Sequence, residues 1–384
     1  MSVTAAKAFV AAGVRCGIRT SGLDLAVVRS LEPATGAAMF TVNRMQAAPV
    51  TVSRRHLAAA EPQAVVVNSG NANAATGPQG LADARATAQH AAGLLGLEPK
   101  QVLVLSTGVI GKRLPLERVL AGLGEAAPAL SRAGASDAAQ AILTTDTRAK
   151  QTVAAGPGFT VGGMAKGSGM IHPHLATMLA VVTTDYPLDP GRAEAFLRPA
   201  VDESFNAISV DGDCSTNDAV VLLANGASRA QRNEEAFARA LADVCAELAR
   251  QIVADGEGAT VLAEINVSGA ASEAEARAIA RRVATSPLVK TALFGRDPNW
   301  GRVLAAAGSA PWDGGYARLE PDRVTLCFNG TAVVDHGTPL PLEPDLDGAE
   351  CRIDLELGLG SGAATYLTSD LSYDYVRINA EYRT

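Results

Sequence analysis

The chain has 384 residues, 48% of them hydrophobic and 19% charged, which is typical of a packed globular protein and excludes a disordered one. Its formal net charge of −7 argues against nucleic acid or an anionic membrane as the main partner. No apolar run approaches the roughly 20 residues that a membrane-spanning helix needs.

The five cysteines are odd in number and widely scattered along the chain. No Cys-x-x-Cys pair and no Cys/His cluster indicates a metal site, so we expect no metal. The N-terminal apolar run 8–14 is short and is followed by Arg15, which disfavours a secretory signal peptide. Together these features predict a reduced, cytoplasmic setting.

Residues 1–60 predict short strands and turns, with strands at 22–28 and 37–42. A short buried strand is expected at 64–67. It runs into the segment 68–74 (NSGNANA), whose small polar residues are typical of tight turns. A helix is expected next, at 80–97, where alanines and leucines occur on several faces.

The next predicted strand, 102–105, ends in a segment of hydroxyl residues and glycines, 106–111. A P-loop is excluded because the GxxxxGK[ST] spacing is absent and Lys112 is followed by arginine. Hydroxyls and glycines just past a strand end can present backbone N–H groups to a developing oxyanion. A plain strand-to-helix turn fits the same residues.

The stretch 166–180 organises the chain: a glycine-rich loop, a proline-restricted turn, and an apolar run that predicts a buried strand. The polar run 143–147 precedes it and has strand-like character. Thr177 lies where the buried strand opens, behind the loop, which is a suitable place for a nucleophile. The plainer interpretation is that Thr177 only begins the strand.

The segment 209–218 is acidic and contains one glycine, yet that glycine is misplaced and no acidic residue closes the loop, which excludes an EF-hand. We expect Cys214 within it to be buried and unreactive. An amphipathic helix is predicted at 237–252, and glycines end it at the loop 255–260. Glu257 lies between two of these glycines, and a loop glutamate of this kind is most often solvated.

Beyond residue 260 the pattern predicts a smaller α/β unit. A strand is expected at 261–267, and Ser272 with Glu275 forms a capping box for a helix that ends at Ala284. A polar, turn-rich loop is expected at 294–302. Further strands are expected at 318–329 and 351–357. The glycines of 358–362 complete no dinucleotide motif, and the C-terminal segment is rich in aromatic and β-branched residues, which disfavours a frayed tail.

Several segments resemble the ornithine acetyltransferase family (ArgJ, glutamate N-acetyltransferase), and the resemblance covers nearly the whole chain. They are the NSGNANA loop, the stretch 166–185, the segment DGDCSTND at 211–218 and the segment DGEG at 255–258. Two departures are Cys214, where the family usually has threonine, and Ala149, where it usually has proline.

The resemblance implies a layered αββα-type sandwich with an N-terminal-nucleophile-like site, comprising residues 1–260, and a smaller C-terminal α/β domain, 261–384. It implies self-cleavage between Ala176 and Thr177, which would give an alpha chain, 1–176, and a beta chain that starts at 177. It also implies a heterotetramer of two alpha and two beta chains.

The same resemblance assigns roles to individual residues. Thr177 is the implied nucleophile, Thr107 and Gly108 the oxyanion hole, and Glu257 a further active-site residue. The implied substrate-binding residues, besides Thr177 and Glu257, are Thr144, Lys166, Asn379 and Thr384.

A threonine hydroxyl needs a base near neutral pH, and an N-terminal threonine carries one in its own α-amino group. The resemblance implies ping-pong transfer of an acetyl group from N-acetylornithine to glutamate through acetyl-Thr177. It implies no cofactor. Some family members also accept acetyl-CoA as a co-substrate, and these residues do not separate the two types. The role of Glu257, in binding or in proton transfer, also stays open.

Two other functions remain open at this point. An aminopeptidase or amidase could use the same nucleophile with water as acceptor, and a non-cleaving binding protein would need no nucleophile at all. A Ser/His/Asp hydrolase is disfavoured because the chain has no GxSxG motif. We expect His172 and His174 to be structural or solvated.

Overall fold

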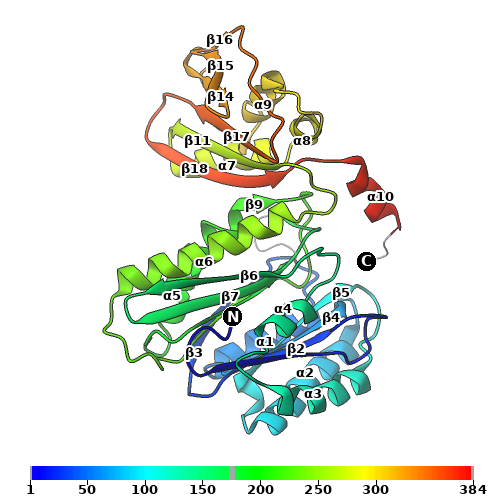
Figure 1. The fold of residues 1–384 in the computed structure, drawn as a ribbon. Coiled ribbons are helices and arrows are strands. Elements are labelled where there is room, and N and C mark those ends of the chain that lie inside the picture. Colours follow the sequence, from blue (N-terminus) through cyan, green and yellow to red (C-terminus); the bar gives the residue numbers. More distant parts are fainter. Residues whose placement is uncertain (1, 173–177, 382–384) are drawn as a thin grey trace. The chain divides into compact units, whose positions relative to one another are not determined.

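The computed structural model describes residues 2–172 and 178–381 (Figure 1). Its chain forms two compact units. Among the described residues, the first unit holds the chain up to Asn206 and Asp213–Ile252, and the second holds Ala207–Gly212 and residues 253–381. The predicted division into domains 1–260 and 261–384 stays a prediction, because compact units are not necessarily independently folding domains.

The first unit contains a four-stranded sheet with the order β1-β2-β4-β5, in which only β4 and β5 run parallel. Its strands are β1 (Phe9–Val14), β2 (Leu25–Ser30), β4 (Ala64–Asn71) and β5 (Val102–Val109). Helices α1 (Ala48–Ala59), α2 (Gly77–Leu95) and α3 (Leu116–Ala129) cover the outer face of this sheet (Figure 1). The 3-10 turn η1 (Pro99–Gln101) leads into β5.

A second, five-stranded sheet of the same unit has the order β3-β10-β8-β7-β6. Its strands are β3 (Thr35–Phe40), β6 (Lys150–Gly156), β7 (Phe159–Lys166), β8 (Leu179–Thr184) and β10 (Ala219–Ala224). Helices α5 (Ala193–Asp202) and α6 (Glu234–Ala254) lie on its outer side (Figure 1).

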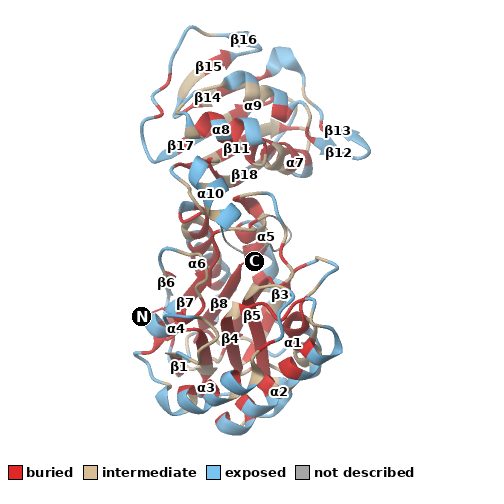
Figure 2. Cartoon of the chain, turned by 90° about the vertical axis from the view of Figure 1, so that its right-hand side faces the viewer, coloured by how far each residue is buried: buried red, intermediate tan, exposed pale blue. Residues whose placement is uncertain are grey.

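The alternating side chains of the central strands explain why these layers stack. In β4, Val65 and Val67 pack into the core between the two sheets, whereas Val66 packs under the outer helices. Met164 and Val181 reach the same inner core from the second sheet, and α4 (Ala135–Ala141) adds alanines to it. Strands buried on both faces read as continuous apolar runs, and Figure 2 shows them as buried. The predicted αββα sandwich is confirmed.

The second unit is built on a seven-stranded sheet with the order β16-β15-β14-β17-β11-β18-β9. The strands are β9 (Ile208–Ser209), β11 (Leu262–Ala270), β14 (Thr325–Phe328), β15 (Thr331–Asp335), β16 (Thr338–Pro339), β17 (Glu350–Glu356) and β18 (Gly362–Ser369). Helices α7 (Glu273–Ala284), α8 (Pro287–Phe294) and α9 (Trp300–Ala307) share a core with this sheet. Ser272 caps α7: its Oγ accepts a hydrogen bond from Glu275 N, which is one half of the predicted capping box.

The remaining elements are short. They are the 3-10 turns η2 (Phe205–Ala207) and η3 (Pro321–Arg323), the hairpin β12 (Pro311–Trp312) and β13 (Gly315–Tyr316), and the terminal helix α10 (Tyr373–Glu381). The tail is therefore ordered as a helix as far as Glu381. Among the described helices, none is long and apolar enough to span a membrane.

Several predicted elements were wrong. Residues 1–60 contain helix α1, which was missed because its valines and Pro49 read as strand and turn residues; proline is tolerated in the first turn of a helix. The run 143–147 is a turn and not a strand. The predicted loop 294–302 includes the start of α9, which Asn299 caps. In 318–329, only Thr325–Phe328 forms a strand.

Candidate active site

The strand end that carries Thr107 and Gly108 is shaped by a bulge. Strand β5 continues through Val109, so these two residues lie inside the strand, and the prediction that they follow its end was wrong. Gly70 and Gly108 pair across β4 and β5 just before the register shifts at Asn71. Gly108 has φ +126°, and a Cβ at this position would overlap the backbone of Gly70 and Asn71. Only glycine fits this close approach.

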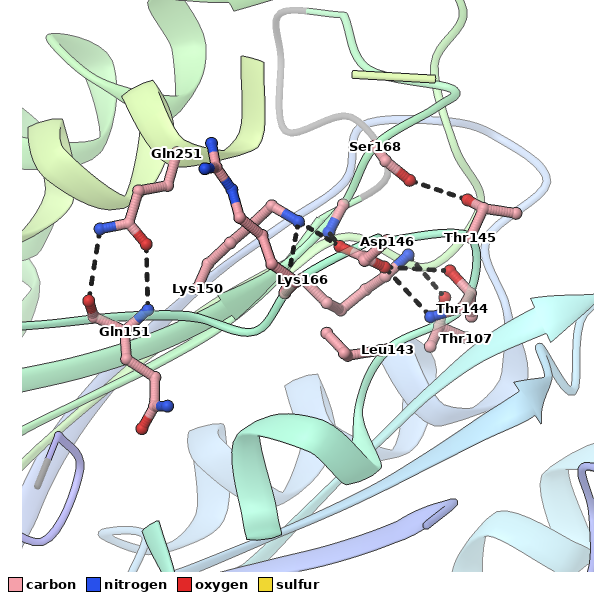
Figure 3. A network of polar contacts seen from close by, with 12 residues as sticks. Thr107, Leu143, Thr144, Thr145, Asp146, Lys150, Gln151, Lys166, Ser168 and Gln251 are labelled. Atoms are coloured by element: carbon pink, nitrogen blue, oxygen red, sulfur yellow. Dashed lines mark hydrogen bonds and ion pairs between the residues drawn. The ribbon is translucent and has the colours of Figure 1, made fainter. Parts of the chain in front are cut away.

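Lys166 is the last residue of β7 in the opposite sheet, and its exposed fraction is only 2%. Its Nζ donates a hydrogen bond to Thr107 Oγ1 over 3.4 Å (Figure 3). A predicted substrate-binding lysine and a predicted oxyanion residue therefore meet where strands of the two sheets end.

Asp146 organises the polar groups around this contact, as Figure 3 shows. Its Oδ1 accepts hydrogen bonds from Lys150 Nζ over 2.7 Å and from Gly167 N over 2.6 Å. Its Oδ2 accepts from Thr144 N over 3.0 Å. The carboxyl group thereby joins the turn that carries Thr144, a predicted substrate-binding residue, to the loop that follows Lys166.

The side chains of Asp146 and Lys150 form a fully buried ion pair. Burial raises the pKa of Asp146, but the charges of Lys166 and Lys150, with the hydrogen bonds from Lys150 and Gly167, outweigh it and bring the pKa to about 2. Asp146 is therefore a carboxylate at neutral pH. The sequence analysis did not identify it; an acidic residue four positions before a lysine was the available signal.

The predicted cleavage residues Ala176 and Thr177 lie outside the described residues, as do His174 and the predicted binding residue Thr384. Strand β8 begins at Leu179, two residues after Thr177. Ahead of the cleavage segment, Ser168 Oγ and Thr145 Oγ1 lie 2.8 Å apart, and this hydrogen bond joins the glycine-rich loop to the Thr144 turn.

Glu257 and Asn379 form a separate group in the second unit. The side-chain amide of Asn379, on α10, donates a hydrogen bond to Glu257 Oε2 over 2.8 Å. Ser372 Oγ donates to the carbonyl of Gly258 over 2.6 Å. A Cβ at Gly258, which has φ +69°, would lie 2.5 Å from Tyr375 N, so glycine lets the start of the tail helix pack against this loop.

Asp370 fixes the other end of the Glu257 loop. Its Oδ1 accepts hydrogen bonds from Thr260 N over 2.8 Å and from Val261 N over 3.0 Å, and its Oδ2 accepts from Thr260 Oγ1 over 2.6 Å. Asp370 directly follows β18, whose end is held by the buried Lys290 through Thr368 Oγ1, over 2.9 Å, and the carbonyl of Ser369. These positioning contacts also escaped the sequence analysis.

Cys214 is half-buried, so the prediction that it is buried was wrong. Burial and the neighbouring Asp218 raise the pKa of its thiol, which keeps the thiol in its less reactive neutral form. His172 is also half-buried. Within the described part of the chain, no group of three His, Cys, Asp or Glu side chains could hold a metal ion.

Comparison with known proteins gives one family over almost the full length. The model of the ArgJ family matches residues 10–384. The arginine biosynthesis bifunctional protein ArgJ of Thermobifida fusca is 45% identical, with 100% of both chains covered. The protein of the same name from Mycolicibacterium paratuberculosis is 48% identical, with 99% of this chain and 96% of that protein covered.

Two solved structures are also similar. The arginine biosynthesis bifunctional protein ArgJ of Bacillus halodurans is 35% identical, with 52% of this chain and 97% of that chain covered and a TM-score of 0.48. The ornithine acetyltransferase of Mycobacterium tuberculosis, complexed with ornithine, is 42% identical, with 45% of this chain and 94% of that chain covered and a TM-score of 0.42.

Proposed function

The chain belongs to the ArgJ family, and from this premise we propose that it is an arginine biosynthesis acetyltransferase that moves the acetyl group of N-acetylornithine to glutamate. The observation that carries the proposal furthest is the contact between Lys166 Nζ and Thr107 Oγ1. It puts a buried cation, suited to a substrate carboxylate, beside a strand end that is suited to an oxyanion.

In the proposed maturation step, Thr177 Oγ attacks the carbonyl carbon of Ala176. The C–N bond between the two residues breaks as the proton of the hydroxyl passes to the threonine nitrogen, which leaves an ester. Water then hydrolyses the ester, giving a carboxylate at Ala176 and a free α-amino group at Thr177. That amine is the base that the hydroxyl needs for catalysis.

In the proposed catalytic step, the Thr177 amine takes the proton of its own hydroxyl, and Oγ attacks the acetyl carbonyl of N-acetylornithine. Thr107 and Gly108 stabilise the oxyanion; one such donor is typically worth about 3–4 kcal/mol. The ornithine amine leaves with a proton, and the amine of glutamate then attacks the acetyl-enzyme to give N-acetylglutamate.

The remaining residues are proposed to bind substrate. Lys166 pairs with the α-carboxylate, and Thr144 lines the site from the turn that Asp146 holds. Glu257, Asn379 and Thr384 are also proposed to bind substrate. Their mutual hydrogen bond supports a shared role for Glu257 and Asn379.

We also propose acetyl-CoA as a second acetyl donor, because both curated relatives named above are called bifunctional. No cofactor and no metal take part in the proposed chemistry. The proposed assembly is a heterotetramer of two alpha and two beta chains in the cytoplasm.

The test combines intact mass under denaturing conditions with an acetyl-transfer assay. We expect two fragments, with the cut between Ala176 and Thr177. We also expect N-acetylglutamate to form only when the acetyl donor and glutamate are both present. An N-terminal-nucleophile amidase would give the same fragments but release acetate at a rate that does not depend on glutamate. A single uncleaved chain with no turnover would contradict the proposal and favour a binding protein.

A further inference from the structure

Asn217 and Asp218 lie just before β10 and have no role in the mechanism above. We call them the Asn217–Asp218 pair. Both are polar and almost fully enclosed, with exposed fractions of 4% and 0%. Burying polar side chains this deeply is costly unless their hydrogen bonds are used, so the partners of each side chain show what the pair does.

Asn217 reaches from the second sheet to the end of the first. Its Nδ2 donates hydrogen bonds to the carbonyl of Ala72 over 2.7 Å and to the carbonyl of Ser106 over 2.8 Å. Ser106 directly precedes Thr107 on β5, and Ala72 directly follows β4. One side-chain amide therefore ties the end of β4 to β5, the strand that carries the proposed oxyanion hole.

Asp218 makes the equivalent connection within its own sheet. Its Oδ1 accepts a hydrogen bond from Met178 N over 2.9 Å, and Met178 is the residue directly after Thr177. Next to it, Ala219 N donates to the carbonyl of Met178 over 3.1 Å, and β10 continues parallel to β8 in the register Ala219 to Leu179. These hydrogen bonds thereby fix the register of the start of β8 relative to β10.

Asp218 makes this connection from a fully buried position. Burial raises its pKa well above the ordinary value, and the opposing effects of Met178 N–H, the charge of Lys166, and the hydroxyls of Ser215 and Thr41 do not offset the burial. Its Oδ2 is buried and has no hydrogen-bond partner within the part of the chain that the structure describes. An asparagine at this position keeps a side-chain oxygen that can accept from Met178 N–H.

We propose that the Asn217–Asp218 pair is a positioning element that sets the distance between the nucleophile strand and the oxyanion-hole strand. The proposal rests on the proposed function, because it takes Thr177 as nucleophile and Thr107 with Gly108 as oxyanion hole. Asn217 holds the strand with the proposed oxyanion hole, and Asp218 holds the strand that follows the proposed nucleophile. Because the two residues are adjacent, the backbone between them fixes one strand relative to the other. Misplacement by about 1 Å costs roughly a hundredfold in rate.

The test compares a matched pair of variants by two measurements, the rate of self-cleavage and the kcat of acetyl transfer. Asp218→Leu has nearly the same shape but no acceptor for Met178 N–H, whereas Asp218→Asn keeps that acceptor. We expect Asp218→Leu to slow self-cleavage and to lower the kcat of whatever cleaved enzyme forms, each by at least about tenfold, with KM changed less than threefold. Asp218→Asn should restore both rates to within about threefold of wild type.

Asn217→Leu tests the other half of the pair and should lower kcat in the same way, again with little change in KM. Thermal unfolding of each variant checks that the chain is folded. The inference would be overturned if Asp218→Leu cleaved itself and turned over substrate at rates within twofold of those of wild type. Equal loss in Asp218→Leu and Asp218→Asn would also overturn it, because the asparagine keeps the proposed contact. If Asp218→Leu does not fold, Asp218→Asn decides: rates within about threefold of wild type support the inference, and a larger loss overturns it.

Wild type and Thr177→Ala are measured in the same series, which separates this inference from the function on which it rests. Cleaved, active wild type beside an uncleaved, inactive Thr177→Ala establishes the nucleophile, and the variants of the pair then judge the positioning element alone. Uncleaved and inactive wild type would overturn the proposed function, and the inference with it.

Discussion

The side-chain amide of Asn379 donates a hydrogen bond to Glu257 Oε2 over 2.8 Å, although 122 residues separate the two positions. Asn379 is on the terminal helix α10, and Glu257 is in the loop that follows α6. Because Gly258 has no side chain, Tyr375 of the helix can approach the loop backbone closely. The terminal helix is therefore fitted to the Glu257 loop.

This contact predicts that Asn379→Ala weakens substrate binding without affecting maturation. Glu257 would lose a hydrogen bond that orients its carboxylate, and bonds to charged groups contribute about 1.5–3 kcal/mol when well formed. Since Asn379 is exposed, we expect the lower part of this range, a KM raised about tenfold. Steady-state kinetics of the cleaved enzyme measure it. An unchanged KM would show that the contact has no part in binding.

Gly108→Ala should stop both self-cleavage and acetyl transfer. The added methyl group would overlap the backbone of Gly70 and Asn71, and φ +126° is unfavourable for alanine. The two strands would have to move apart at the proposed oxyanion hole, with a loss of at least about a hundredfold in kcat. Mass spectrometry and the transfer assay measure the two effects.

Gly111→Ala is the matched control for Gly108→Ala. Gly111 also has a positive φ, +79°, but a Cβ there would meet no atom within 4 Å. It therefore introduces similar backbone strain three residues away without pushing the strands apart. Equal loss of activity in both variants would mean that strain, rather than the close approach at Gly70, is responsible.

Much of the sandwich was predictable because β-strands that are buried on both faces show up as apolar runs, as in 64–67 and 102–105. What the sequence concealed depends on distant partners. Asp218 contacts Met178, 40 residues away, and Asn217 contacts Ser106, 111 residues away. Nothing in the local pattern distinguishes these side chains from those of an ordinary polar turn. The family resemblance located the segment but assigned no role to either residue.

Asp146→Asn should destabilise the folded chain. Lys150 would remain fully buried beside a neutral amide, and breaking a buried ion pair in this way costs about 3–5 kcal/mol. Urea unfolding at pH 7, followed by far-ultraviolet circular dichroism, measures this loss. The control is Asp189→Asn, which breaks the exposed pair with Arg232 and should change stability little.

We also expect the stability contribution of Asp146 to depend on pH. The pKa of Asp146 is about 2 in the folded chain, below the ordinary value of about 3.9 in the unfolded chain. Its contribution to stability is therefore complete above pH 4 and is lost as the pH falls toward 2. The stability difference between wild type and Asp146→Asn should shrink over that interval. A difference that stays constant would show that the carboxylate charge is not what stabilises the turn.

Lys290, in the second unit, predicts a pH dependence of the same sign at alkaline pH. Burial lowers its pKa to about 8, although the charges of Asp370 and Asp211 act in the other direction. Below pH 8 the lysine is charged in both folded and unfolded chains. Between pH 8 and about 10.4 only the unfolded chain keeps the proton, so the folded state gains stability as the pH rises, by up to about 3 kcal/mol.

The measurement is urea unfolding of wild type and Lys290→Met at pH 7.5 and pH 10, followed by tryptophan fluorescence. Both tryptophans, Trp300 and Trp312, belong to the second unit, so the signal reports the unit that contains Lys290. The stability of wild type relative to Lys290→Met should rise between the two pH values, because other titrating groups cancel in the difference. A stability difference between wild type and Lys290→Met that does not depend on pH would mean that the buried amine keeps an ordinary pKa.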